Sequence, residues 1–136
     1  TYTGVAANPP YMGQRNMNGA LKQYLDDQYP AEKFDLFAVF IEKMLNLIKP
    51  KCKLGCITMQ SCMFISTYEK LRKWILYNFT IDSLSHFGWH ILRIAFGTAA
   101  MIIKKRKPQP NDLGIYSYLE IKDIEKEIER LKNASL

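Results

Sequence analysis

The sequence predicts an α/β fold, with a mostly parallel sheet and flanking helices. Short apolar segments of strand character alternate along the chain with segments whose apolar residues recur at helical spacing. Strands that alternate with helical segments of about 10 to 15 residues imply crossover connections, which join parallel strands. The chain has 136 residues, of which 48% are hydrophobic, so we expect one domain with its own core.

The first part of the chain predicts one strand and two helices. Residues 4–7 form a short apolar run that two prolines stop, which is typical of a buried strand ending in a rigid loop. A helix is expected over residues 19–28. A second helix begins at Asp35 as its N-cap and ends before Pro50. Its apolar residues recur every three or four positions: Leu36, Phe37, Phe40, Ile41, Met44, Leu45 and Ile48.

The remainder predicts further strands separated by a helix. β-Branched and apolar runs predict strands over residues 54–59, 80–87, 97–104 and 115–121. Ser66 and Glu69 have the spacing of a capping box, which predicts a helix from there to about Tyr77. A last helix is expected after Asp123, its predicted N-cap.

The charge balance and the apolar pattern limit the classes of partner. A formal net charge of +6 fits a partner with phosphate groups, although many proteins with such an excess bind none. Part of it is the run Lys104–Lys107, which is more typical of a solvated strand end than of a binding site. No segment reaches the roughly 18 apolar residues of a membrane span, and no secretory leader is evident. We therefore expect a cytoplasmic protein without a membrane partner.

Cysteine and histidine give no sign of a metal site. Cys52, Cys56 and Cys62 lie near an apolar run without zinc-ligand spacing, so we expect free core thiols. His86 and His90 are four residues apart, but His86 belongs to a strand pattern and no carboxylate is suitably placed between the two. Structural histidines are the better interpretation, and no metal is expected.

The loop Asn8-Pro9-Pro10-Tyr11 carries the strongest chemical signal in the chain. Each proline lacks an N–H and favours extended geometry in the residue before it, so the loop is stiff. The Pro9 carbonyl and the Asn8 side-chain oxygen place two acceptors after a strand, where open α/β sheets bind ligands. Two acceptors can hold one NH2 group, and the Tyr11 ring offers a face for stacking. A proline turn without chemistry is the alternative interpretation.

Residues 5–13, VAANPPYMG, resemble motif IV of adenine-N6 DNA methyltransferases. Other segments resemble the later motifs of that family in the same order: DLFAVFIEKMLNLIKP (35–50), LGCITMQSCMF (54–64), YEKLRKWIL (68–76) and TIDSLSHFG (80–88). The likeness covers about residues 3–107. It is greatest to the PglX-type methyltransferases of BREX phage-defence systems, with the related type IIG restriction-modification methyltransferases next.

The resemblance implies the C-terminal half of a class I (Rossmann-like) methyltransferase fold, S-adenosyl-L-methionine as methyl donor and N6-methyladenine in double-stranded DNA as product. Asn8 and Pro9 would hold the target amine, and Tyr11 would stack on the flipped adenine. Pro10 and Phe96 would make further substrate contacts. The exocyclic amine is a poor nucleophile because its lone pair is delocalised into the ring, and two fixed acceptors would localise that pair.

Important parts of such an enzyme are absent from this sequence. None of the seven glycines belongs to a G-x-G pair, so the main cofactor-binding motif is not present. We therefore expect residues 1–107 to be the catalytic half of a methyltransferase domain, from motif IV onward. Residues 108–136 would be a connector or the start of a downstream region. The chain alone should be inactive, and an exposed sheet edge should favour self-association.

The alternative function is non-catalytic. The same fold could serve as a DNA-contacting or assembly scaffold with partner proteins of a defence system, the loop being kept but unused. Methylation of RNA or of a protein glutamine is a further alternative, which the extended likeness to DNA-modifying sequences disfavours. The DNA recognition sequence, and the choice between self-marking and restriction, do not follow from these residues.

Overall fold

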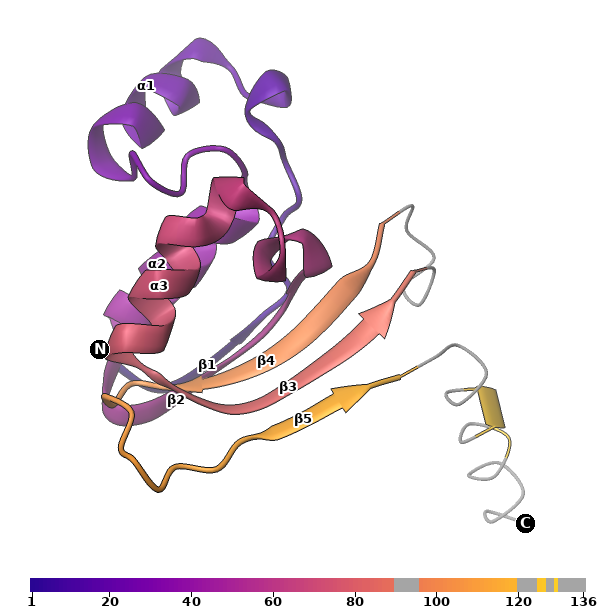
Figure 1. The fold of residues 1–136 in the computed structure, drawn as a ribbon. Coiled ribbons are helices and arrows are strands. Elements are labelled where there is room, and N and C mark those ends of the chain that lie inside the picture. The colour runs from indigo at the N-terminus through magenta and orange to yellow at the C-terminus, as the bar shows by residue number, and fades with distance from the viewer. Residues whose placement is uncertain (90–95, 120–124, 127–128, 130–136) are drawn as a thin grey trace.

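A five-stranded sheet forms the centre of the molecule (Figure 1). The structure is a computed structural model, and it describes residues 1–89, 96–119, 125–126 and 129. The strands stand side by side in the order β1-β2-β4-β3-β5. They comprise β1 (Tyr2–Ala7), β2 (Ile48–Met59), β3 (Thr80–Gly88), β4 (Thr98–Lys104) and β5 (Ile115–Tyr118).

Four strands run in one direction, and β4 runs against them. β1 pairs with β2 in parallel and β3 pairs with β5 in parallel, whereas β4 is antiparallel to both of its neighbours, β2 and β3. The predicted α/β class is confirmed, with β4 as the strand that makes the sheet mixed. The carboxyl ends of β1, β2, β3 and β5 therefore meet the amino end of β4 at one margin, which we call the carboxyl edge.

The helices are α1 (Gly19–Gln28), α2 (Leu36–Leu47) and α3 (Glu69–Asn78), and α2 and α3 lie over the same face of the sheet (Figure 1). Asp35 is the N-cap of α2, as predicted, because its side chain accepts a hydrogen bond from Phe37 N. Most of the predicted apolar stripe of α2 packs in the core, but Phe40 is 39% exposed and Ile48 already belongs to β2. Phe37 and Ile41 are fully buried in one core cluster with Leu54 of β2 and Ile103 of β4.

The other face of the sheet has no helix over it among the described residues. Side chains alternate between the two faces of a strand, so Leu54 is buried while its neighbour Gly55 is not. Ala6, Ala100 and Ile102 also lie on this second face, and the Ile102 side chain is 41% exposed. We call it the open face. Its residues are small or aliphatic, which suits a surface that packs against more protein.

The predicted capping box of α3 is wrong. Ser66–Tyr68 form a short 3-10 turn and α3 begins only at Glu69, with no side-chain hydrogen bond at its N-cap. Glu69 is thus the first helical residue and not the third, so it cannot reach back to Ser66 as a capping box requires. Its Oε1 lies 2.6 Å from Lys73 Nζ, one turn further along the helix.

The strand that follows α2 begins earlier than predicted. The helix ends at Leu47, before Pro50 as expected, but β2 starts directly at Ile48 and not near Leu54. Lys51 has a φ of 67°, and the pairing with β1 shifts register nearby. The hydrophobic pattern did not predict this part of β2 as a strand, because its lysines are exposed. Its strand geometry depends instead on pairing with neighbouring chain segments.

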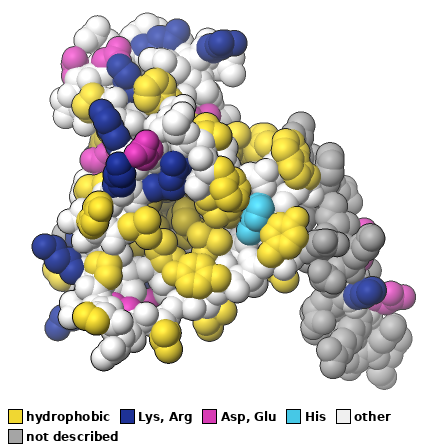
Figure 2. Space-filling model, viewed as in Figure 1, with side chains coloured by type: hydrophobic (Ala, Val, Ile, Leu, Met, Phe, Trp, Pro, Cys, Tyr) yellow, Lys and Arg dark blue, Asp and Glu magenta, His cyan; other side chains and the backbone are white. Residues whose placement is uncertain are grey.

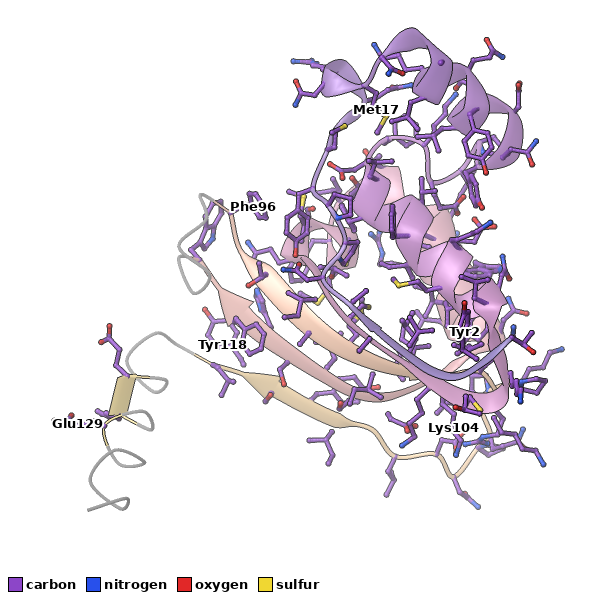
Figure 3. The ribbon with its side chains drawn as sticks, turned by 180° about the vertical axis from the view of Figure 1, so that it is seen from behind. Tyr2, Met17, Phe96, Lys104, Tyr118 and Glu129 are labelled. Atoms are coloured by element: carbon purple, nitrogen blue, oxygen red, sulfur yellow. The ribbon has the colours of Figure 1, made fainter. Side chains whose placement is uncertain are left out.

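The basic run at the end of β4 has structural partners, far from the carboxyl edge. Figure 3 shows Lys104 and Phe96 at opposite ends of the sheet. Lys105 Nζ donates to the carbonyl oxygens of Ile48 at 2.9 Å and Asn46 at 3.3 Å, at the C-terminus of α2. A cation is favourable there because the helix dipole is negative at that end. Lys105 thus has a structural role at the end of β4.

The last predicted elements are only partly described. β5 ends at Tyr118, and residues 120–124, which include Asp123 and the end of the predicted strand, lie outside the described residues.

Among the residues that are described, no helix is both long and apolar enough to cross a membrane.

A buried carboxyl group near the start of α2 gives a pH-dependent prediction. Glu32 is only 6% exposed, and burial, together with its interaction with Glu42, raises its pKa from 4.5 to about 7. A raised pKa means that the folded state favours the protonated form. Stability is therefore greatest below the unfolded pKa and falls as the pH rises from about 4.5 to about 7.

We expect the Glu32→Gln variant to lose this fall, because a neutral amide can occupy the site at any pH. At pH 8 it should be more stable than the wild type by roughly 1–2 kcal/mol, allowing for partial solvent screening. Urea unfolding between pH 4 and pH 8 measures the effect. The exposed Glu125→Gln is the matched control, and an unchanged pH profile in Glu32→Gln would contradict the assignment.

Candidate active site at the carboxyl edge

The loop that carried the strongest sequence signal leaves the sheet at the carboxyl edge. β1 ends at Ala7, and Asn8 is the next residue. The strand cannot continue further, because the two prolines after Asn8 provide no N–H for pairing. The Asn8 side chain is exposed, whereas Pro9 is buried and anchors the loop. In Figure 3 Phe96, at the amino end of β4, lies at this edge, and Tyr2 lies at the other end of the sheet.

The Tyr11 hydroxyl orients the Asn8 side chain. Tyr11 Oη donates to Asn8 Oδ1 at 3.0 Å and lies 3.3 Å from the carbonyl oxygen of Ile57 in β2. Burial is the main cause that raises the pKa of Tyr11, so the hydroxyl stays a donor at neutral pH. The Asn8 carbonyl is thereby fixed in direction. It keeps a second lone pair for another donor.

The second candidate acceptor is the neighbouring carbonyl oxygen, that of the buried Pro9. Among the described residues no donor reaches it, and the residue after it is a proline without an N–H. Asn8 and Pro9 therefore present acceptors from two consecutive residues of a stiff loop. Such a pair can bind an NH2 group through both of its hydrogens.

Aromatic rings surround Tyr11. The ring of Phe96 lies 5.0 Å from that of Tyr11 between centroids and is inclined to it by 77°. Phe37 lies 6.3 Å away on the side of α2, and Tyr68 packs against Phe37 at 5.1 Å. The structure thus brings together the two aromatic residues predicted for the site. Phe37 was predicted only as a core residue, and its spacing within α2 could not reveal its contact with Tyr11.

Asp35 links the loop to α2. Its Oδ1 accepts from Met12 N at 3.0 Å as well as from Phe37 N at 3.2 Å. The sequence predicted the bond within the helix but not the one to Met12, because nothing in local spacing connects positions so far apart.

Comparison with known proteins identifies the family of the chain. The family model of the Eco57I restriction-modification methylases matches residues 2–91, most of the chain. The chain belongs to the Eco57I restriction-modification methylase family. The matched part includes the Asn8–Tyr11 loop, Asp35 and strands β1 to β3.

Individual relatives of this Eco57I-family chain match nearly all of it. The adenine-specific methyltransferase BrxX of Escherichia coli O9:H4 (strain HS) is 38% identical, over 97% of this chain and 11% of the relative. The adenine-specific methyltransferase PglX of Lacticaseibacillus casei (strain Zhang) is 34% identical, over 87% of this chain and 10% of the relative. The predicted family is confirmed. The chain spans about a tenth of the length of these curated relatives.

The fold also has a solved counterpart. A class I S-adenosylmethionine-dependent methyltransferase from Listeria monocytogenes superposes with a TM-score of 0.65 at 14% sequence identity. The match covers 96% of this chain and 42% of that protein. The predicted fold, that of one half of a class I methyltransferase, is therefore confirmed for this Eco57I-family chain.

The residues beside Asn8 do not form a complete site for a nucleotide cofactor. A hollow of about 470 Å³ adjoins Asn8, and none of the residues that line it carries a charge: Ala6, Ala7, Asn8, Gly55, Cys56, Ile57, Ala100, Met101 and Ile102. S-adenosyl-L-methionine has a charged amino-acid end and ribose hydroxyls, which require polar partners. These residues fit at most its apolar surroundings.

A second polar cluster lies further along the carboxyl edge. His86 Nε2 lies 2.5 Å from Gln60 Oε1, and its ring contacts Phe64 and Tyr118. Figure 2 shows the histidine side chain among hydrophobic residues. This supports a structural role for His86, while His90 lies outside the described residues. No group of three metal-ligating side chains occurs in the part of the chain that the structure describes.

The cysteines of this Eco57I-family chain are free thiols, as predicted. Cys56 and Cys62 are buried in the core, and burial raises the pKa of Cys56 to about 12. Such thiols are protonated at neutral pH and poor nucleophiles. Cys52 is half-buried and packs against the margin of the same core cluster.

Proposed function

We propose that residues 1–107 form the catalytic half of an adenine-specific DNA N6-methyltransferase that acts in restriction-modification or phage defence. The observation that carries this proposal is the pair of acceptors at the carboxyl edge, Asn8 Oδ1, which the Tyr11 hydroxyl orients, and Pro9 O, which no donor reaches among the described residues. The names of BrxX and PglX as adenine-specific methyltransferases support it. Residues 108–136 would connect to a downstream region.

The acceptor pair answers a specific chemical need. The N6 amine of adenine is a weak nucleophile because the ring withdraws its lone pair. Hydrogen bonds from its two hydrogens to Asn8 Oδ1 and Pro9 O would favour a pyramidal nitrogen, whose lone pair points away from both acceptors. They would also stabilise the positive charge that develops on nitrogen during transfer, without a strong base.

The aromatic residues around the loop would hold the base outside the duplex. An adenine flipped from the stack loses its neighbours, and stacking on Tyr11 would offset part of that cost. Phe96 is inclined steeply to Tyr11, so its ring could contact the edge of a base that stacks on Tyr11. Pro10 is exposed next to Tyr11 and would contact the same base or its sugar.

S-adenosyl-L-methionine would supply an electrophilic methyl group. Because the residues beside Asn8 do not complete a cofactor site, its main contacts would come from protein outside residues 1–136. The chain alone would then bind the cofactor too weakly to be active. The location would be the cytoplasm, where such an enzyme meets DNA.

The decisive test uses the complete protein that contains this chain, expressed with its neighbouring genes. Genomic DNA is sequenced by a method that reads N6-methyladenine directly and is compared with DNA from cells without the gene. Methylation at one sequence motif, present only with the gene, supports the proposal. Expressed protein without methylation would favour a DNA-contacting scaffold in a defence complex.

The free edge of β1 gives a separate prediction for the isolated chain. Within the described residues only one side of β1 is paired, so its other side can pair with another copy. Light scattering of residues 1–136 should give a mass that rises with concentration. Ala6→Lys, which places a charge on this exposed strand, should reduce the association at least about threefold, and Ala20→Lys on α1 should not. A monomer at every concentration would refute it.

A further inference from the structure

Asp35 makes two hydrogen bonds that serve different parts of the molecule. Its Oδ1 accepts from Phe37 N, within α2, and from Met12 N, which follows the loop residue Tyr11. The side chain is buried, with the residue 8% exposed. One carboxylate oxygen therefore joins the start of a core helix to the chain directly after the Asn8–Tyr11 loop.

The backbone strengthens the same junction. Leu36 N donates to Met12 O at 3.1 Å, and Gln14 N donates to Phe34 O at 3.0 Å. Gly13 and Asp35 form an antiparallel bridge between the two segments. The loop is thus fixed at both sides, by the Tyr11 hydroxyl toward β2 and by Asp35 toward α2. A shift at Met12 would be transmitted to Tyr11 through one peptide bond.

A capping role alone does not require this arrangement. The side chain of Asn18, which is exposed and neutral, caps α1 by accepting a single hydrogen bond from Leu21 N at 2.9 Å. Asp35 is instead buried, which raises the pKa of its carboxyl group, while its bonds to backbone N–H groups oppose that rise. Burying a carboxylate is costly unless N–H groups compensate it, and Met12 supplies one of these.

We propose that Asp35 is a positioning residue for the methyl-transfer reaction, holding Met12 so that Tyr11 and Asn8 keep the geometry that binds the target amine. This rests on the proposed function. Displacement of reacting groups by about 1 Å can cost about 100-fold in rate. The loss should appear in the chemical step and not in DNA affinity, because Asp35 is buried and would not contact DNA itself.

Two substitutions separate positioning from capping. In Asp35→Ser the shorter side chain can still cap α2 but cannot reach Met12 N, whereas in Asp35→Asn the carbonyl oxygen can accept from both N–H groups. Asn18→Ala is the control for loss of a helix cap away from the loop. All are made in the complete protein, with single-turnover methylation, DNA affinity and amide hydrogen exchange measured for each.

We expect Asp35→Ser to methylate about 10- to 100-fold more slowly in single turnover, with DNA affinity within about threefold of the wild type. Its Met12 amide should exchange faster while Phe37 stays protected. Asp35→Asn and Asn18→Ala should both stay within about fivefold of the wild-type rate. A wild-type rate in Asp35→Ser, or an equal loss in Asp35→Asn, would overturn the positioning role while the proposed function stands. A wild type that methylates no adenine would overturn both.

Discussion

The Asn8→Ala variant of the complete protein is expected to lose about 10²- to 10³-fold or more of its single-turnover methylation rate. The substitution removes one of the two acceptors for the target amine and leaves the Pro9 carbonyl alone. Asn8 is exposed and its side chain bonds only to Tyr11 among the described residues, so the fold should change little. Unfolding free energy should stay within about 0.5 kcal/mol.

The measurement is transfer of a labelled methyl group to duplex DNA with enzyme in excess. Asn46→Ala, an exposed asparagine on α2, is the matched control and should retain the wild-type rate. DNA affinity of Asn8→Ala should also remain near the wild-type value, because the loss concerns the reacting amine. If Asn8→Ala methylates as fast as the control, the acceptor-pair mechanism is wrong.

The second large effect is expected at Tyr11, where ring and hydroxyl can be separated. Tyr11→Ala removes the stacking face and leaves a gap between Phe37 and Phe96. We expect a loss of about 10²-fold in methylation rate and about 1–3 kcal/mol in stability, since the ring is half-buried. Tyr11→Phe keeps the ring and loses the bonds to Asn8 and Ile57, which should cost about 3- to 10-fold.

A fluorescent adenine analogue, 2-aminopurine, at the target position distinguishes the two roles. Its emission should rise on flipping with the wild type and Tyr11→Phe, and less with Tyr11→Ala, which lacks the stacking partner. Equal flipping in all three proteins would show that Tyr11 does not stack on the base. A wild-type methylation rate in Tyr11→Phe would contradict the orienting role of the hydroxyl.

The sequence predicted the helices and strands whose own pattern determines them. The stripe along α2 and the proline stop after β1 are local signals, and both elements stand where they were expected. The first part of β2 was missed because pairing, not pattern, makes it a strand. The capping box failed because a 3-10 turn at Ser66–Tyr68 moved the start of α3.

The candidate site divides in the same way. Asn8, Pro9 and Tyr11 are contiguous, so a short motif was enough to find them. Asp35 and Phe37 contact the loop only after α2 has packed on the sheet, and no spacing rule connects residues so far apart. Phe96 was placed through the family resemblance alone, and its contact with Tyr11 depends on the register of β4 against β2.

The position of β4 has a consequence for how the protein is made. β4 stands between β2 and β3, although both of these strands precede it in the chain. During synthesis, β2 and β3 leave the ribosome before residues 98–104 do. The edges that these two strands turn toward each other therefore stay unpaired until β4 inserts between them. Ile103 of β4 enters the core in the same step. Phe96 lies just before β4 in the chain, so it reaches its place beside Tyr11 at the same time. The sheet and the aromatic surroundings of the loop should thus form together, late and in one cooperative event.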